Sequence, residues 1–208
     1  MLFITATDTD VGKTFFSKSL INHLVTSGAY DRTEIAYFKA VQCGEPTDFD
    51  EIKKETGIDI YCSYNLAYPA SPDYAASLES IEISLEKIKT DFDELKTKYK
   101  FIVVEGAGGA AVPLNKKETV ADLINLLGIE AVLVIRPDLG TINHSLITVD
   151  YLKAKAVDIK GLFVSAKSRE LSEAYNVSVE DKKKQNDAAI ESIKRFSGLQ
   201  TLELSDFA

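Results

Sequence analysis

Short apolar runs alternate with helix-like segments along most of the chain. The runs are four or five residues long, which is typical of strands buried on both faces of a sheet. They occupy residues 2–5, 34–38, 101–104, 131–135 and 161–164. We expect each of them to form a strand.

The segments between these runs carry apolar residues at helical spacing. Phe16, Leu20 and Leu24 recur in steps of four, and Gly28 is a plausible stop. The clearest amphipathic pattern covers residues 84–99, and two further helices are expected at 143–155 and 188–196. Alternating strands and helices predict an α/β fold, with a mostly parallel sheet flanked by helices on both faces.

Length and charge narrow the function classes. The 208 residues favour one domain over residues 1–208, with two domains as the alternative. A net charge of -8 argues against nucleic acid or an anionic membrane as a partner. No apolar run approaches the ~18 residues of a membrane helix, and no signal peptide is apparent. Cys43 and Cys62 lack metal-like spacing and read as free thiols, so we expect a cytoplasmic protein.

In a parallel sheet, ligands bind at the carboxyl ends of the strands. The first such loop ends in Gly12-Lys13-Thr14 and leads into a helix. Backbone N–H groups there can hold phosphate, the lysine can reach the β- and γ-phosphates, and the hydroxyl can bind Mg²⁺. The full pattern G-x-x-x-x-G-K-[ST] fails because Thr7 replaces its first glycine. A chance Gly-Lys-Thr on a surface turn is the alternative, and the flanking strand and helix favour phosphate binding.

The stretch ATDTDVGKT (6–14) resembles the loop of the dethiobiotin synthetase family, G-T-D-T-[ED]-V-G-K-T, with Ala6 as the one difference. Four further segments are similar to motifs of that family and follow in the same order: FKAVQCG (38–44), PASPDYAA (69–76), VVEGAGGAAVPL (103–114) and LGTINHSLIT (139–148). The resemblance covers about the first three quarters of the chain. It implies a P-loop NTPase-like fold and a single ATP-binding synthetase domain.

What the resemblance implies chemically is an ATP- and Mg²⁺-dependent ring closure in biotin biosynthesis. 7,8-Diaminononanoate would take up CO₂ as a carbamate, and a carbamate oxygen would attack the γ-phosphate. The second amine would then close the ureido ring of dethiobiotin, with release of phosphate. The resemblance also implies a homodimer.

The resemblance assigns site residues by position. Lys13 and Lys39 are expected to be catalytic. The nucleotide and its Mg²⁺ are expected to contact Asp10, Val11, Gly12, Lys13, Thr14, Phe15, Asp50, Glu105, Gly106, Ala107 and Gly108. The second substrate is expected to contact Thr9, Asp10, Lys39, Cys43, Ser71, Thr141 and Asn143. The metal ligands are expected to be Thr14, Asp50 and Glu105.

The chemistry of these residue types fits those roles. Lys39 follows the second strand and could stabilise charge on both a carbamate and a γ-phosphate, although a surface lysine is the alternative. Glu105 ends an apolar run beside flexible glycines, which suits a Mg²⁺ ligand, although a tight turn with an incidental glutamate is the alternative. Asp48 could replace Asp50 as the metal ligand, or could be a helix N-cap with Glu51 at N3.

Two further acidic and polar features concern the second substrate. Asp10 could attract a cationic diamine. The segment from Thr141 to His144 opens a helix whose free N–H groups could bind the substrate carboxylate. By resemblance, this segment reaches the site across a homodimer interface. The alternatives are an N-cap role for Asn143 and a surface histidine at His144.

The chain also departs from the family pattern. Cys43 replaces a serine, and Asp73 replaces a histidine. Ser165-Ala166-Lys167 stands where the family has an Asn-Asp that reads the purine, and the G-x-x-P segment near the C-terminus is absent. We therefore expect weaker ATP affinity or looser nucleotide selectivity.

Three other functions stay open. An ATPase switch of the partition or septum-positioning type normally has a second lysine, where this chain has Asp8. Another synthetase on the same scaffold, such as an amidotransferase domain, would need an ammonia source. A nucleotide-binding module without catalysis would not need Lys39 and Glu105 at two further strand ends.

Overall fold

The computed structural model describes residues 1–165 and 179–207. Within them, one six-stranded sheet has the order β3-β2-β4-β1-β5-β6, and every pair of neighbouring strands runs parallel. The strands are β1 (Leu2–Ala6), β2 (Ile35–Cys43), β3 (Asp59–Leu66), β4 (Phe101–Glu105), β5 (Ala131–Ile135) and β6 (Ile159–Val164). The expected parallel sheet is confirmed.

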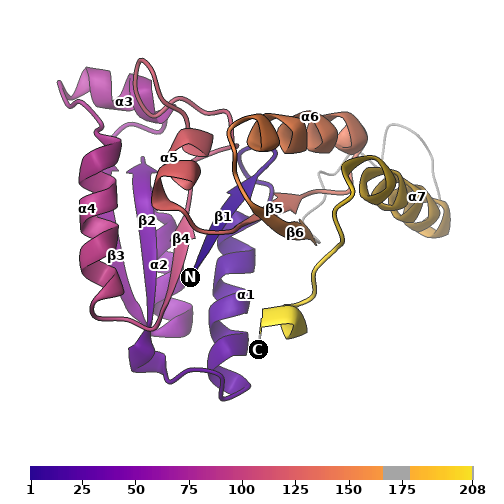
Figure 1. Ribbon diagram of the computed structural model, residues 1–208, viewed down its shortest axis with the longest axis horizontal. Coiled ribbons are helices and arrows are strands. Elements are labelled where there is room, and N and C mark those ends of the chain that lie inside the picture. Colours follow the sequence, from indigo (N-terminus) through magenta and orange to yellow (C-terminus); the bar gives the residue numbers. More distant parts are fainter. Residues whose placement is uncertain (166–178, 208) are drawn as a thin grey trace.

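Helices cover both faces of this sheet, as Figure 1 shows. They are α1 (Lys13–Thr26), α2 (Asp48–Thr56), α3 (Pro72–Leu78), α4 (Leu85–Lys96), α5 (Val120–Leu127), α6 (Thr141–Ala154) and α7 (Val179–Ser197). Short 3₁₀ turns lie at Arg32–Glu34 and Leu204–Phe207. One apolar core joins the sheet to α1 and α2, and a second core joins the opposite face to α4, α5 and α6. The α/β architecture with helices on both faces is therefore confirmed.

The elements that the apolar pattern missed are short or partly exposed. β3 is the edge strand, and most of its residues are only partly buried, so it lacks an apolar run. The helices α2, α3 and α5 have seven to nine residues and lacked a long periodic pattern. The structure also extends β2 to Cys43 and begins α6 at Thr141 and α7 at Val179.

The strand order brings the carboxyl ends of β1, β2 and β4 together. β4 lies between β1 and β2, and Lys39 of β2 is directly opposite Glu105 of β4. Because the strands are parallel, their carboxyl ends meet at one edge of the sheet. The loop after β1 reaches the same edge and leads into α1. The three segments therefore share one site although they are far apart in the sequence.

Gly12, at the start of α1, has a backbone that requires glycine. Its φ is 116°, in the left-handed region that side chains disfavour. A Cβ atom at this position would also lie 2.4 Å from Oγ of Ser165. The close packing of the β1–α1 loop against the end of β6 thus requires a residue without a side chain at position 12.

Among the described residues, no helix is long and apolar enough to span a membrane.

Candidate active site

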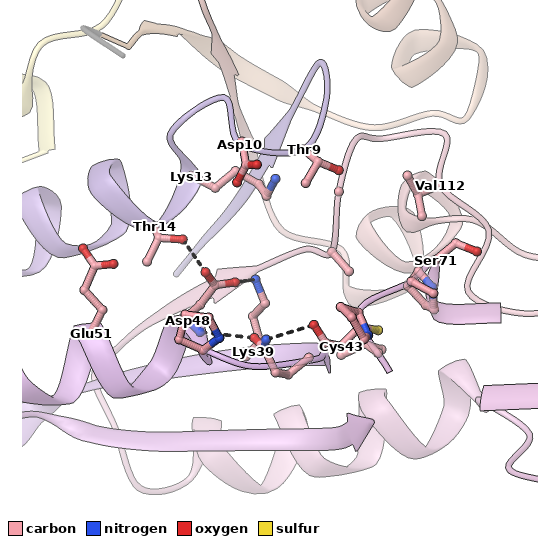
Figure 2. A pocket seen from close by; sticks show the side chains of 18 of the residues that line it. Thr9, Asp10, Lys13, Thr14, Lys39, Cys43, Asp48, Glu51, Ser71 and Val112 are labelled. Atoms are coloured by element: carbon pink, nitrogen blue, oxygen red, sulfur yellow. Dashed lines mark hydrogen bonds and ion pairs between the residues drawn. The ribbon is translucent and has the colours of Figure 1, made fainter. Parts of the chain in front are cut away.

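A cleft of about 610 Å³ opens at the carboxyl ends of β1, β2 and β4 (Figure 2). Its walls come from the β1–α1 loop, the end of β2, the start of α2, the segment before α3 and the loop after β4. Most of the expected site residues line this cleft: Thr9, Asp10, Gly12, Lys13, Thr14, Phe15, Lys39, Cys43, Ser71, Ala107 and Gly108. The sequence motifs therefore converge on a single hollow.

The side chain of Lys39 lies between two carboxylates at the base of this cleft. Its Nζ donates a hydrogen bond to Oδ2 of Asp48 and another, of 2.9 Å, to Oε1 of Glu105. Glu105 is fully buried and Lys39 almost so. Burial disfavours the Lys39 ammonium, but the charges of Glu105 and Asp48 outweigh burial and raise its pKa. Lys39 is therefore a charged ammonium held in a fixed position.

Two hydroxyl groups of α1 complete this cluster. Thr14 Oγ1 lies 2.9 Å from Oδ1 of Asp48 and 3.2 Å from Oε1 of Glu105. Ser17, one turn further along the helix, donates to Oε2 of Glu105 at 2.6 Å. Figure 2 shows Thr14, Asp48 and Lys39 turned toward one another. A hydroxyl and two carboxylates thus meet beside the phosphate-type loop, and they are the oxygen donors that Mg²⁺ prefers.

No cluster of three or more His, Cys, Asp or Glu side chains that could hold a metal occurs in the described parts of the chain. A site built on Asp48, Glu105 and the Thr14 hydroxyl therefore offers few protein ligands. That composition suits Mg²⁺, which keeps several water ligands and shares phosphate oxygens with a nucleotide.

Lys13 is buried at the other side of the cluster. Its Nζ donates to the carbonyl oxygen of Asp8 at 3.3 Å. Burial, followed by the positive charge of Lys39, lowers the pKa of Lys13 to about 8. An anionic ligand in the cleft would favour the charged form, so this lysine is well placed to bind phosphate.

Asp50 does not join the cluster, contrary to the expectation from resemblance. It is exposed, does not line the cleft and hydrogen-bonds with Thr47 at the start of α2. Asp48 takes the place beside Thr14 and Glu105. Burial opposes the charged form of Asp48, but the charge and hydrogen bond of Lys39 outweigh it and lower the pKa of this carboxyl group. The N-cap assignment of Asp48 is also wrong, since Thr47 is the N-cap, and Glu51 pairs with Lys18 at 2.6 Å.

Five other expected residues do not line the cleft, and one of them, Glu105, lies fully buried at its base. Val11 is buried in the core, and Gly106 lies under the cluster, where a Cβ atom would lie 3.0 Å from the Phe3 ring. Thr141 lines a separate hollow of about 60 Å³ at the start of α6, and Asn143 is exposed there. Within one chain, the start of α6 therefore does not contribute to the main cleft.

Sequence reasoning missed Ser17 and Gln42. Gln42 is buried and donates to the carbonyl oxygen of Gly44 at 3.1 Å, while its Oε1 accepts from the N–H of Asp48 at 3.4 Å. It thereby ties the end of β2 to the start of α2. The sequence could have indicated Ser17, because it lies three residues after Thr14 and therefore on the same face of the helix.

The residues that depart from the family pattern lie in different parts of the structure. Cys43 lines the cleft, and burial raises the pKa of its thiol to about 11, so the group is neutral. Asp73 accepts a hydrogen bond of 2.7 Å from Ser71 at the start of α3. Ser165 lies against Gly12, whereas Ala166 and Lys167 lie outside the described residues.

Comparisons with known proteins agree with this arrangement. A family model described as an AAA domain matches residues 1–202. An ATP-dependent dethiobiotin synthetase BioD of Methanococcus vannielii is 40% identical, over 79% of this chain and 78% of the relative. The protein of the same name from Methanocaldococcus jannaschii is 39% identical, over 79% of each.

Solved structures that resemble this chain include proteins of other function. The ParA family ATPase of Chlorobium tepidum TLS is 11% identical, with a TM-score of 0.54 and coverage of 96% of this chain and 81% of that one. A chain of the MinC:MinD cell division protein complex of Aquifex aeolicus is 16% identical, with a TM-score of 0.51. The match covers 89% of this chain and 77% of that one. At these identities the likeness concerns the fold alone, and the expected P-loop NTPase-like fold is confirmed. The family match and the extent of identity show that the chain belongs to the family of ATP-dependent dethiobiotin synthetases, within the AAA domain family.

Proposed function

We propose that this chain catalyses the ATP- and Mg²⁺-dependent carboxylation and ring closure of 7,8-diaminononanoate, with dethiobiotin, ADP and phosphate as products. The observation that carries this proposal is the position of Lys39. Its ammonium lies between Asp48 and Glu105, at the point where the phosphate-type loop meets the wider cleft. A nucleotide switch needs no cationic group at that boundary, whereas a synthetase must hold two anionic reactants there.

The nucleotide would bind at the start of α1. The first N–H groups of a helix have no partner within the helix and bind phosphate well. Lys13 would neutralise the β- and γ-phosphates, since among the described residues its buried ammonium has a backbone oxygen of Asp8 as its only hydrogen-bond partner. Phe15 and Gly12 line the cleft on either side of this position.

Mg²⁺ would be held by Thr14, Asp48 and Glu105. The fit is supported by the Thr14 hydroxyl, which lies within hydrogen-bond distance of both carboxylates. When bound, Mg²⁺ would neutralise part of the phosphate charge. We propose Asp48 for the role first assigned to Asp50, because Asp50 lies outside the cluster.

The second substrate would occupy the part of the cleft beyond Lys39. Apolar side chains line it and would suit the alkyl chain of a diamino acid: Val41, Cys43, Pro69, Ala70, Pro72 and Val112. Asp10 and Thr9 lie at its phosphate side, where the Asp10 carboxylate would attract an ammonium group. Ser71 offers a hydroxyl at the α3 side.

The reaction would proceed in three bond-forming steps. One amine attacks CO₂ and loses a proton, and the resulting carbamate oxygen attacks the γ-phosphorus while ADP leaves. The second amine then attacks the carbamoyl carbon and expels phosphate as the ring closes. Lys39 would stabilise the negative charge on the carbamate and on the transferred phosphoryl group, and Lys13 the charge that develops on ADP.

A homodimer would complete the substrate site. Thr141 and Asn143 lie outside the cleft of their own chain. Around them, α6 and the loop before it expose large apolar side chains, with Leu139 84% and Ile147 61% exposed. We propose that this surface binds a second copy, so that the start of α6 reaches the substrate carboxylate in the partner's cleft.

ADP release separates this function from the alternatives. Protein, ATP, Mg²⁺ and bicarbonate are mixed with and without 7,8-diaminononanoate, and ADP is followed over time. We expect release only with the diamine. Equal release without the diamine would favour an ATPase switch, and release that requires ammonia instead would favour another synthetase.

A further inference from the structure

The fully buried carboxylate of Glu105 has its two oxygens in different surroundings. Oε1 faces the cleft cluster, where Thr14 and Lys39 lie 3.2 Å and 2.9 Å away. Oε2 points into the protein and accepts a hydrogen bond of 2.6 Å from Ser17, whose side chain is also fully buried. Ser17 therefore engages the oxygen on the side away from the ligands. The fully buried phenol of Tyr37, whose pKa is raised by burial and then by the charge of Glu105, also lies near this carboxylate.

We propose that Ser17 is a positioning residue that fixes the carboxylate plane of Glu105 and thereby sets the affinity of the site for Mg²⁺. This inference rests on the proposed role of Glu105 as a Mg²⁺ ligand. Groups that hydrogen-bond a metal ligand orient it and raise metal affinity, typically by a factor of about 10–100. Ser17 touches neither the cleft nor the proposed reactants, so it would act only through Glu105.

The helix gives this contact its rigidity. Ser17 follows Thr14 by three residues, so both hydroxyls project from one face of α1 toward the end of β4. The same helix starts at the phosphate-type loop. α1 would consequently fix three groups in one rigid element. These are the phosphate-binding loop at its start, the Thr14 hydroxyl that binds Mg²⁺, and the Ser17 hydroxyl that supports Glu105.

The test compares Ser17→Ala and Ser17→Cys with the wild type. The alanine removes the donor, and the thiol is a weak donor of similar shape. Binding of ATP is measured by calorimetry, first in EDTA and then over a series of Mg²⁺ concentrations. We expect the half-saturating Mg²⁺ concentration to rise about 10–100-fold for Ser17→Ala and by less for Ser17→Cys. ATP binding in EDTA should stay within about twofold of the wild type, because the phosphate cradle is intact.

Ser145→Ala is the matched control. Ser145 is also a fully buried helical serine, but its hydroxyl has no hydrogen-bond partner among the described residues. It should leave the Mg²⁺ dependence unchanged. An unchanged Mg²⁺ dependence of Ser17→Ala, or an equal shift in Ser145→Ala, would overturn the role of Ser17. A wild-type protein whose ATP binding does not respond to Mg²⁺ would instead contradict the proposed metal site itself.

Discussion

At the scale of single residues, the site is a set of buried charges that compensate one another. Lys39 is charged because Glu105 and Asp48 offset the cost of burying its ammonium. In the part of the chain that the structure describes, Lys13 has no carboxylate at hydrogen-bond distance, and burial lowers its pKa to about 8. One lysine is thus held by the protein, while the other is left to bind an anionic ligand. We therefore propose different tasks for the two lysines of the cleft.

The first residue-scale prediction concerns Lys39. Replacing it by methionine keeps much of the side-chain volume but removes the ammonium that we propose to lie between carbamate and γ-phosphate. Loss of one such stabilising group typically lowers kcat by about 10²–10³. Steady-state kinetics of diamine-dependent ADP release measure this change. The control is Lys18→Met, which removes the ion pairs with Glu51 and Glu55 of α2 and the contact of the Lys18 ammonium with the Phe15 ring. A similar loss in both variants would contradict the catalytic role.

A second residue-scale prediction concerns the pH dependence of Cys43. Burial raises the pKa of its thiol to about 11, so the reactive thiolate gains population only as the pH rises toward that value. In a Cys62→Ala background, iodoacetamide should alkylate Cys43 slowly at pH 8, and the rate should keep rising through pH 10. Mass spectrometry measures the rate. A rate that is half-maximal near pH 8.5 and level by about pH 10, as for an ordinary thiol, would contradict the raised pKa of this partly buried group.

At the scale of secondary structure, short elements carry much of the chemistry. α2 begins at Asp48, and its N-cap Thr47 accepts a hydrogen bond from the N–H of Asp50. The cap therefore determines which aspartate faces Thr14. Gln42 supports the same turn from the end of β2.

The element-scale prediction uses this cap. Thr47→Ala should lower the free energy of unfolding by about 1 kcal/mol, because the cap of α2 is lost. It should also raise the Mg²⁺ concentration needed for half-maximal ATP binding, because the proposed Mg²⁺ ligand Asp48 is the first residue of this helix. Urea unfolding and calorimetry measure the two effects.

Ser84→Ala gives the control for the cap variant. Ser84 is the N-cap of α4 and accepts from the N–H of Lys87, but it does not line the cleft. A similar loss of stability without any change in Mg²⁺ dependence is expected. Equal effects on Mg²⁺ dependence in the two variants would remove the link between the α2 cap and the metal site.

The sequence predicted those elements whose burial is uniform. β1 and β5 are buried along their whole length, so each reads as an apolar run. The edge strand β3 has solvent on one side, and its mixture of polar and apolar residues hid it. The sequence did not show which of Asp48 and Asp50 faces Thr14, because this depends on which residue caps α2. Ser17 was overlooked because its role depends on what lies opposite α1 in three dimensions.

At the scale of the whole molecule, the cleft and the start of α6 form two separate polar regions on one chain. Thr141 faces a small hollow beside Asp8 and Arg136, and it lies outside the main cleft. Arg136 donates to the carbonyl oxygen of Asp10 at 3.4 Å, so the α6 loop contacts the phosphate-type loop. In a dimer, the start of α6 of one chain could bind substrate in the cleft of the other chain.

The molecule-scale prediction concerns that assembly. Ile147→Glu places a charge on the exposed apolar face of α6 and should disrupt the dimer with little effect on the folded chain. Sedimentation should show a shift to monomer, and the KM for the diamine should rise more than the KM for ATP. Phe196→Glu is the control, since Phe196 is 70% exposed on α7. A wild-type protein that sediments as a monomer with full activity would contradict the shared site.

The most direct test of the proposed function follows the carbon atom of CO₂. Protein, ATP, Mg²⁺, 7,8-diaminononanoate and ¹³C-bicarbonate are incubated, and the products are examined by mass spectrometry together with ADP. We predict dethiobiotin that carries one ¹³C atom, formed with one ADP per molecule, and almost none of it with Lys39→Met. ADP release without labelled dethiobiotin would contradict the assignment of this cleft to a synthetase.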